Sequence, residues 1–211
     1  VVIDERVCEG CGDCGAVSNC LSVQPVDTPW GRKTRIDQGS CNLDHSCMLG
    51  DCPSFMTVSL GGTERFVPVD PPADLPVPGT AMRDCAVRLS GIGGTGVVTL
   101  NQILGTAAML QGYHVRGLDQ TGLSQKAGPV VSDLRLTVTA PSDSNKSTTG
   151  AADVLLALDQ LVAGSEGTLR AADSSRTAVV VNTAEVPTGS MVVHPDRPFP
   201  SDDVHRDERS S

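Results

Sequence analysis

Aromatic residues are scarce in this chain of 211 residues, which has one Trp, one Tyr and three Phe. The core must therefore be built from Val, Leu, Ala and Ile. The sequence also lacks an apolar run near the ~18 residues of a membrane span, so we expect no membrane partner. It opens at Val1 with neither a signal segment nor an initiator Met. We therefore expect a cytoplasmic protein, and a fragment or processed product of a longer one.

Positive charge is in short supply too. The chain has 16 Lys and Arg against 25 Asp and Glu, a formal net charge of −9. No cluster of basic residues offsets this locally, and an acidic surface repels nucleic-acid phosphates. The composition therefore predicts no nucleic-acid partner.

Cysteine, by contrast, is abundant, and seven of the eight cysteines fall between Cys8 and Cys52. A disulfide-stapled secreted domain is one interpretation, but the missing signal segment disfavours it. Steps of two residues between cysteines favour a shared metal or cluster.

The order is Cys8-x2-Cys11-x2-Cys14-x5-Cys20, then Cys41-x5-Cys47-x4-Cys52-Pro53. Two such runs are typical of two-cluster ferredoxins, in which the fourth cysteine of each run binds the other cluster. On that template Cys8, Cys11, Cys14 and Cys52 hold one [4Fe–4S] cluster, and Cys20, Cys41 and Cys47 belong to a second. Glycines at 10, 12 and 15 would let the backbone wrap closely around the first.

The second set lacks a thiolate, and Leu21 follows Cys20 where the template has Pro. Asp44, His45 and Asp51 are candidates for the missing ligand, and a three-iron cluster or no second cluster are the alternatives. A structural zinc site is the other interpretation of the cysteines, although CxxCxxC spacing suits a cubane better. Cys85 stands apart and is expected to be a small core hydrophobe.

The chain divides into a ferredoxin-type segment (1–62), a Pro-rich linker (63–83), an α/β domain (84–195) and a disordered tail (196–211). In the third zone apolar strand-like runs alternate with helical stretches. Strands are predicted at 85–90, 113–116, 133–139, 153–158 and 177–182, with a helix over 97–111. This order predicts a doubly wound, mostly parallel, Rossmann-like sheet that is truncated near its end.

A glycine-rich turn connects the first of these strands to the helix and contains Gly91, Gly93, Gly94 and Gly96. This setting suits a bound phosphate, or only tight strand–helix packing. No acid ends the second strand, and Asp119 comes late for a nucleotide ribose. A long polar loop is expected at 117–129. Its Ser124, Gln125 and Lys126 are candidates to bind a phosphate or carboxylate, unless the loop is merely solvated.

Taken together, RVCEGCGDCG, SNCLSVQPV, SCN, GDCPSF, GIGGTGVVT and GLDQTGLSQKAGPVVSDLRL resemble one family. The chain is similar, to about Met191, to the fused indolepyruvate ferredoxin oxidoreductases. It resembles their ferredoxin-type segment joined to the gamma domain of the 2-oxoacid:ferredoxin oxidoreductases.

The resemblance implies oxidative decarboxylation of an aryl or branched 2-oxoacid to an acyl-CoA, with thiamine diphosphate, Mg²⁺ and coenzyme A. Electrons would leave through the Fe–S clusters to ferredoxin. The sequence has no GDG…N thiamine motif and no nucleophile–base pair, so no catalytic residue is assigned. The thiamine chemistry is expected on missing domains or subunits of an oligomeric enzyme.

Two other functions stay open. The first is an Fe–S protein feeding an NAD(P)H- or flavin-binding domain, which the glycine-rich turn would also suit. The second is a zinc-stabilised interaction module without catalytic activity.

Overall fold

The computed structural model describes residues 1–59, 61, 82–122, 128–141, 144–194, 196 and 199–200. Its elements in chain order are β1 (Val2–Ile3), α1 (Asp13–Ser18), β2 (Val23–Thr28), β3 (Gly31–Ile36), the 3-10 helix η1 (Ser46–Met48), β4 (Phe55–Met56), β5 (Cys85–Ile92), α2 (Val97–Leu110), β6 (His114–Thr121), β7 (Pro129–Thr137), β8 (Val154–Ala157), α3 (Gln160–Ala163), α4 (Glu166–Leu169), β9 (Ala178–Val181) and α5 (Gly189–Val193).

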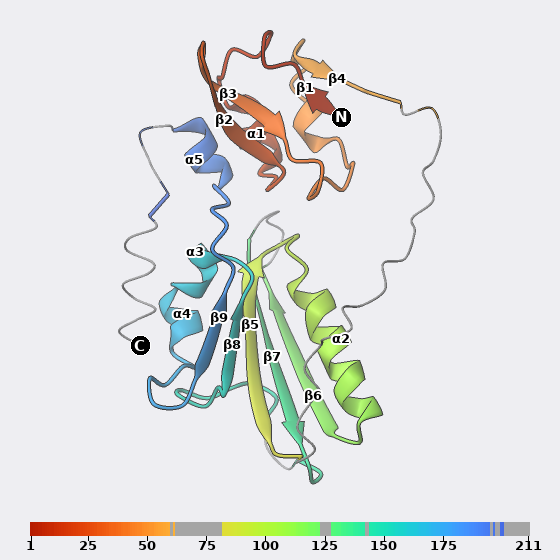
Figure 1. Cartoon of the computed structure of the whole chain (residues 1–211), viewed down its shortest axis with the longest axis vertical. Helices are drawn as coiled ribbons and strands as arrows, with labels where there is room; N and C mark the ends of the chain where they lie inside the picture. The colour runs from red at the N-terminus through yellow and green to blue at the C-terminus, as the bar shows by residue number, and fades with distance from the viewer. Residues whose placement is uncertain are drawn as a thin grey trace, which may run out of the picture.

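Residues 1–59 form a small unit that we call the cysteine-rich unit (Figure 1). It contains two antiparallel pairs of strands: β2 with β3 in a hairpin, and β1 with β4. Ile3, Val23 and Ile36 are buried between them, and the cysteines pack around this centre. The unit has very little apolar material of its own, so the cysteines themselves are part of its core.

The second body, which we call the sheet domain, contains a five-stranded sheet in the order β6-β7-β5-β8-β9. β5, β8 and β9 are parallel neighbours, while β7 is antiparallel to both β5 and β6. The predicted α/β class is confirmed, with one strand, β7, running against the other four. That reversal arises because β6 and β7 are consecutive and pair directly, without a crossover helix between them.

The prediction of a polar loop over residues 117–129 is wrong for its first five residues. Gly117 to Thr121 continue β6, which is twice as long as the predicted strand, and pair with β7 from Leu134 to Val130. The polar side chains that resembled a loop are satisfied inside the sheet. Asp119 accepts hydrogen bonds from Ser132 Oγ at 2.5 Å and from Asn101 Nδ2 at 2.8 Å.

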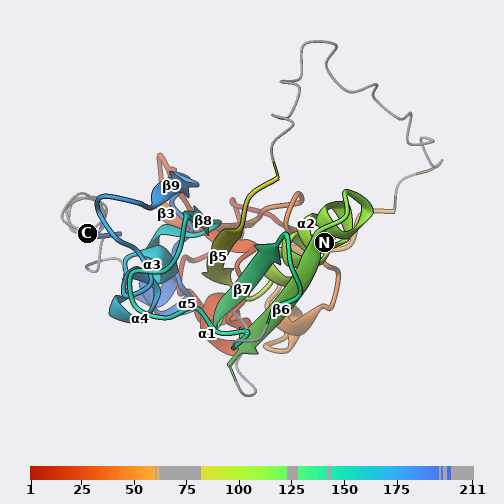
Figure 2. The ribbon, with the colours of Figure 1, turned by 90° about the horizontal axis from the view of Figure 1, so that it is seen from below.

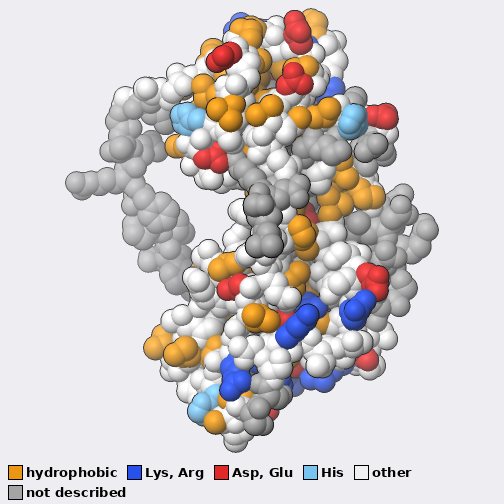
Figure 3. Space-filling model, turned by 180° about the vertical axis from the view of Figure 1, so that it is seen from behind, with side chains coloured by type: hydrophobic (Ala, Val, Ile, Leu, Met, Phe, Trp, Pro, Cys, Tyr) orange, Lys and Arg blue, Asp and Glu red, His pale blue; other side chains and the backbone are white. Residues whose placement is uncertain are grey.

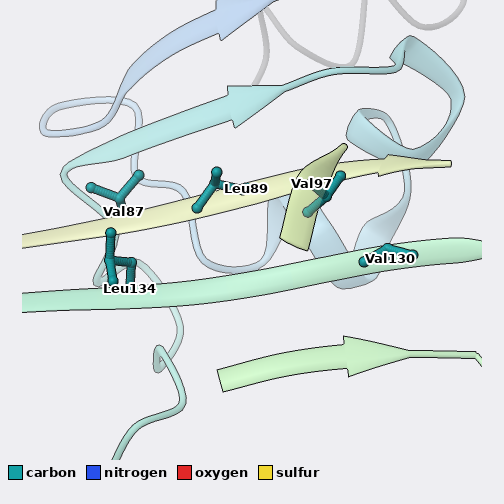
Figure 4. Packing of buried hydrophobic residues seen from close by; sticks show 5 residues of the cluster. All are labelled: Val87, Leu89, Val97, Val130 and Leu134. Atoms are coloured by element: carbon teal, nitrogen blue, oxygen red, sulfur yellow. The ribbon is translucent and has the colours of Figure 1, made fainter. Parts of the chain in front are cut away.

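Helix α2 covers one face of the sheet. Val97 in its first turn packs with Val87, Leu89, Val130 and Leu134 of β5 and β7, and these five side chains form the main core (Figure 4). Burying side chains of this size contributes roughly 1.5–3 kcal/mol each to folding. Aliphatic residues therefore build the core, as the scarcity of aromatics requires.

The opposite face, covered by α3 and α4, contains a buried ion pair (Figure 2). Arg88 of β5 lies directly across from Asp133 of β7, and its Nε and Nη2 donate to the two carboxylate oxygens at 2.9 and 3.1 Å. Arg88 Nη1 also donates to the carbonyl oxygen of Gly167 in α4 at 3.1 Å. The side chains are only 5% and 0% exposed, so the pair is bidentate and dry.

The cysteine-rich unit and the sheet domain are in contact. Helix α5, which follows the sheet, packs against α1 and β2, and Arg32 Nη2 donates to the carbonyl oxygen of Met191 at 3.3 Å. Figure 1 shows α5 beside the cysteine-rich unit, above the carboxyl ends of the parallel strands.

Two predicted segments cannot be compared with the structure. The expected linker (63–83) lies outside the described residues apart from its last two, and so does most of the expected tail (196–211). Among the described helices, none is long and apolar enough to cross a membrane.

The buried ion pair gives a first prediction. Asp133→Asn removes one charge and leaves the Arg88 guanidinium uncompensated in a dry site, which should lower the free energy of unfolding by about 3–5 kcal/mol. Urea unfolding followed by circular dichroism measures the change.

The control is Glu166→Gln, because Glu166 pairs with Arg170 at 2.7 Å on the surface. This exposed pair should contribute less than about 0.5 kcal/mol. Equal effects of the two substitutions would contradict the importance of the buried pair.

Candidate functional site

Four cysteines from distant parts of the chain meet around one cavity in the cysteine-rich unit. The cavity has a volume of about 430 Å³, and Cys8, Cys11, Cys14 and Cys52 all line it. The sequence assigned these four to one cluster, with Cys52 joining from the second run. The structure thus brings the predicted set together, although the binding of a cluster there stays a prediction.

Local backbone geometry turns the first three cysteines toward the cavity. Gly10 and Gly12 adopt left-handed conformations, with φ of +75° and +78°, and Gly12 is the N-cap of α1. A Cβ at Gly10 would overlap the carbonyl oxygen of Arg32, and one at Gly12 would lie 2.9 Å from Val193 Cα. These two glycines therefore let the loop pack closely against β3 and α5, while the predicted wrapping around a cluster stays a prediction.

Strand pairing brings in the fourth cysteine. Asp4 N donates to Ser54 O at 2.8 Å, beside the pairing of Ile3 with Phe55, so the segment after Cys52 is anchored beside the segment before Cys8. Cys52 Sγ lies 2.9 Å from Ser54 Oγ, within hydrogen-bonding distance. The two ends of the unit therefore close around the cavity.

The three cysteines predicted to bind a second cluster do not lie apart from the first set. Cys20, Cys41 and Cys47 pack against the same small core as the first set. Cys47, however, also lines the cavity of the first set, which spacing alone had not indicated. Cys47 thus lies between the two predicted sets.

All eight cysteines are free thiols. Burial raises the pKa of Cys14 to about 11, and the neighbouring Cys8 and Cys11 add to this effect, while hydrogen bonds oppose it. A thiol must lose its proton to bind iron or zinc, so metal would displace protons here. The donor set, four converging thiols in a partly buried cavity, fits an Fe–S cluster.

Within the described part of the chain, no three His, Cys, Asp or Glu side chains come close enough to hold a single metal ion. Ligands of a cubane differ in that each sulfur binds a different iron, so they surround a volume and not a point. The arrangement around the cavity is of this second kind.

The glycine-rich turn lies at the carboxyl end of β5. Neighbouring side chains fill the space beside two of its four glycines. A Cβ at Gly91 would lie 2.6 Å from Thr95 Oγ1, and one at Gly94 would lie 2.7 Å from Leu21 Cδ2. Gly93 N donates to Gly128 O at 2.8 Å instead of pointing to an open site. Gly96 (φ +87°) has open space around it and caps α2.

Gly94 therefore meets Leu21, the residue directly after Cys20. The other predicted ligands of this region, Ser124, Gln125 and Lys126, lie outside the described residues. Phosphate binding by the turn stays a prediction, and close packing accounts for at least Gly91 and Gly94.

Sequence reasoning missed a polar pair at the carboxyl end of β8. Asp159 and Gln160 are each 1% exposed, and Asp159 caps α3 by accepting from Val162 N at 2.9 Å. Asp159 Oδ2 and both amide atoms of Gln160 have no hydrogen-bond partner, and burial raises the pKa of Asp159. The available signal was an acid and an amide placed directly after an apolar strand.

Comparison with known proteins now identifies the family. The family model described as pyruvate ferredoxin/flavodoxin oxidoreductase matches residues 86–209, more than half of the chain. The chain belongs to this family. The predicted gamma-type domain and the oxidoreductase class are confirmed at this level.

A curated relative matches more narrowly. Over 54 residues, 26% of this chain, it is 37% identical to the indolepyruvate oxidoreductase subunit IorB of Thermococcus kodakarensis, and it covers 27% of that protein. The chain thus spans about a quarter of the length of this relative.

Among solved structures, the pyruvate oxidoreductase subunit PORC of Thermotoga maritima is 20% identical with a TM-score of 0.39, covering 49% of this chain and 52% of that one. The 2-oxoglutarate:ferredoxin oxidoreductase of Magnetococcus marinus is 18% identical with a TM-score of 0.41, covering 52% and 19%.

Close packing at Gly10 gives a second prediction. Gly10→Ala places a methyl group against the carbonyl oxygen of Arg32, so the loop must move away from β3. Gly31→Ala is the control, because Gly31 has a similar φ of +92° but nothing within 4 Å of its Cβ position. Thermal and urea unfolding should show Gly10→Ala to be less stable than Gly31→Ala by about 1–3 kcal/mol. Equal stabilities would mean that the loop is not held against β3.

Proposed function

We propose that this chain is the electron-transferring part, with the gamma domain, of a 2-oxoacid:ferredoxin oxidoreductase with an indolepyruvate-type substrate. Cys8, Cys11, Cys14 and Cys52 hold a [4Fe–4S] cluster that carries single electrons toward ferredoxin. The observation that carries the proposal is the convergence of these four cysteines on one cavity, in a chain whose other body belongs to the oxidoreductase family.

Contacts between the two bodies support a role as a fixed conduit. Leu21 of the cysteine-rich unit lies against Gly94 of the glycine-rich turn, and Gly15 of α1 packs against Val192 of α5. These contacts hold the cysteine-rich unit against the sheet domain. The chain's own residues thus bind and position the redox centre, while the cofactor supplies the redox chemistry.

Further parts of the enzyme complete the reaction. We propose that domains or subunits outside this chain bind thiamine diphosphate and Mg²⁺ and decarboxylate the 2-oxoacid, with coenzyme A as acyl acceptor. Assembly with them would make an oligomer. The eight cysteines form no disulfide in the structure, and this suits the reducing cytoplasm that we propose.

The identity of the 2-oxoacid substrate is the most specific part of the proposal. The stretch shared with an indolepyruvate oxidoreductase subunit favours an aryl or branched 2-oxoacid over pyruvate. A nicotinamide or flavin site at the glycine-rich turn is less favoured, because Gly93 N–H is already bonded and Gly94 is covered by Leu21.

Metal analysis tests the redox centre. Anaerobically purified full chain should contain at least about four irons with equal sulfide, and dithionite should produce an electron paramagnetic resonance signal of a reduced cluster. Cys14→Ser should lose most of this iron, because Cys14 lines the cavity.

Cys85→Ser is the matched control, since Cys85 lies in β5, away from that cavity. It should keep the full iron content. Zinc without sulfide in the unaltered chain would contradict the redox proposal and leave an interaction module.

Reconstitution tests the activity. With the remaining domains or subunits of the enzyme, ferredoxin and coenzyme A, the chain should support ferredoxin reduction by indolepyruvate in preference to pyruvate. The chain alone should reduce no ferredoxin with either 2-oxoacid. Equal rates with both substrates would contradict the aryl preference, and activity of the chain alone would contradict the division of labour.

A further inference from the structure

The backbone around the first three cysteines is repeated around the second set. Cys8, Cys11 and Cys14 are separated by the same two-residue steps as Cys41, Asp44 and Cys47. In the first copy Gly10 and Gly12 have φ of +75° and +78°. The matching residues of the second copy, Leu43 and His45, have φ of +59° and +60°. The two loops thus share a left-handed backbone at the same two positions.

This conformation is costly in the second copy, because it is unfavourable for residues with a Cβ. Within the described part of the chain, the non-glycine residues with positive φ are Asn19, Leu43, His45 and Asp51. Leu43 and His45 lie in the second loop, and the other two lie beside cysteines. Asn19 directly precedes Cys20, and Asp51 directly precedes Cys52. Strained backbone that lies within or directly beside the cysteine-bearing segments indicates a functional geometry there.

Asp44 occupies the position that Cys11 has in the first copy. Cys11 precedes the left-handed N-cap of α1, and Asp44 precedes the left-handed N-cap of η1, which is His45. Cys11 and Asp44 are both exposed. Cys14 and Cys47 follow as the second residue of each helix and are both half-buried.

Contacts of Asp44 support a fixed orientation. Ser46 N and Ser46 Oγ donate to Asp44 Oδ1 at 3.1 and 2.8 Å, which holds the carboxylate in the loop. Burial is the main cause that raises the pKa of Cys47, and charges on Cys20, Cys41 and Asp44 add to it. Cys20, Cys41 and Cys47 also pack against one small core, which places the three thiols of the second set together.

We propose that Asp44 is the fourth ligand of a second iron–sulfur cluster, beside Cys20, Cys41 and Cys47. The inference rests on the proposed function. It supplies a fourth ligand for the second cluster, for which the sequence provides only three cysteines. The other two candidates fit less well: His45 matches Gly12, an N-cap, and Asp51, like Asn19, directly precedes the last cysteine of its run. Neither position provides a ligand in the first copy.

A carboxylate is a harder ligand than a thiolate and binds iron less firmly in a sulfide-rich site. One iron of the second cluster should therefore be labile. When ferricyanide takes one electron and this iron leaves as Fe²⁺, a [4Fe–4S]²⁺ cluster becomes an oxidised [3Fe–4S]⁺ cluster. The first cluster, with four thiolates, should resist the same treatment.

The test uses the full chain, purified without oxygen, and counts iron and sulfide before and after ferricyanide, with electron paramagnetic resonance of the product. The unaltered chain should hold about eight irons and release about one, giving a three-iron signal. Asp44→Asn keeps the oxygen that accepts from Ser46 but loses the charge, and should hold about seven irons from the start. Asp44→Cys should retain all its iron and give no three-iron signal.

Asp51→Asn is the matched control, since Asn tolerates positive φ and only a carboxylate is lost. It should behave like the unaltered chain. If Asp44→Asn and Asp44→Cys release iron as the unaltered chain does, the assignment of Asp44 is wrong. About four irons in every variant would also overturn it, while the proposed function stands. Iron and sulfide absent from all variants would instead overturn the proposed function.

Discussion

Bringing Cys52 beside Cys8, Cys11 and Cys14 is the constraint on which the cysteine-rich unit depends. The four residues are far apart in sequence, and each local feature of the unit helps to close that distance. Pairing of β1 with β4 joins the two ends, and left-handed glycines bend the loop before α1. The hydrophobic centre is small and is completed by the cysteines themselves. A cluster bound by these cysteines would add stability to that of apolar burial.

The sheet domain is stabilised differently. Its aliphatic core and the buried Arg88–Asp133 pair lie on opposite faces of β5 and β7, so the two central strands are fixed from both sides. Hydrophobic and acidic side chains gather over the cysteine-rich unit in Figure 3, while Lys and Arg lie mainly over the sheet domain. The contact between Leu21 and Gly94 then links a residue next to Cys20 to the turn that follows β5. The cysteine-rich unit and the sheet domain therefore share one interface.

Much of this arrangement could be predicted from sequence, because it depends on short-range patterns. Cysteine spacing identified four of the five cysteines around the cavity, and apolar periodicity located α2 to within a residue. The reversed strand β7 and the extension of β6 could not be found in this way. They depend on pairing between strands, and the Asp119 side chain that resembled a loop residue is satisfied by Ser132 and Asn101. Likewise, only the backbone dihedral angles show that Leu43 and His45 repeat Gly10 and Gly12.

The central claim is that Cys8, Cys11, Cys14 and Cys52 surround one iron–sulfur cluster. A crystal structure of the anaerobically purified full chain, with anomalous diffraction recorded on both sides of the iron absorption edge, tests it most directly. The account predicts iron density within the cavity, bonded to the sulfurs of these four cysteines. A disulfide between any two of them, or a single zinc ion in place of iron, would contradict it.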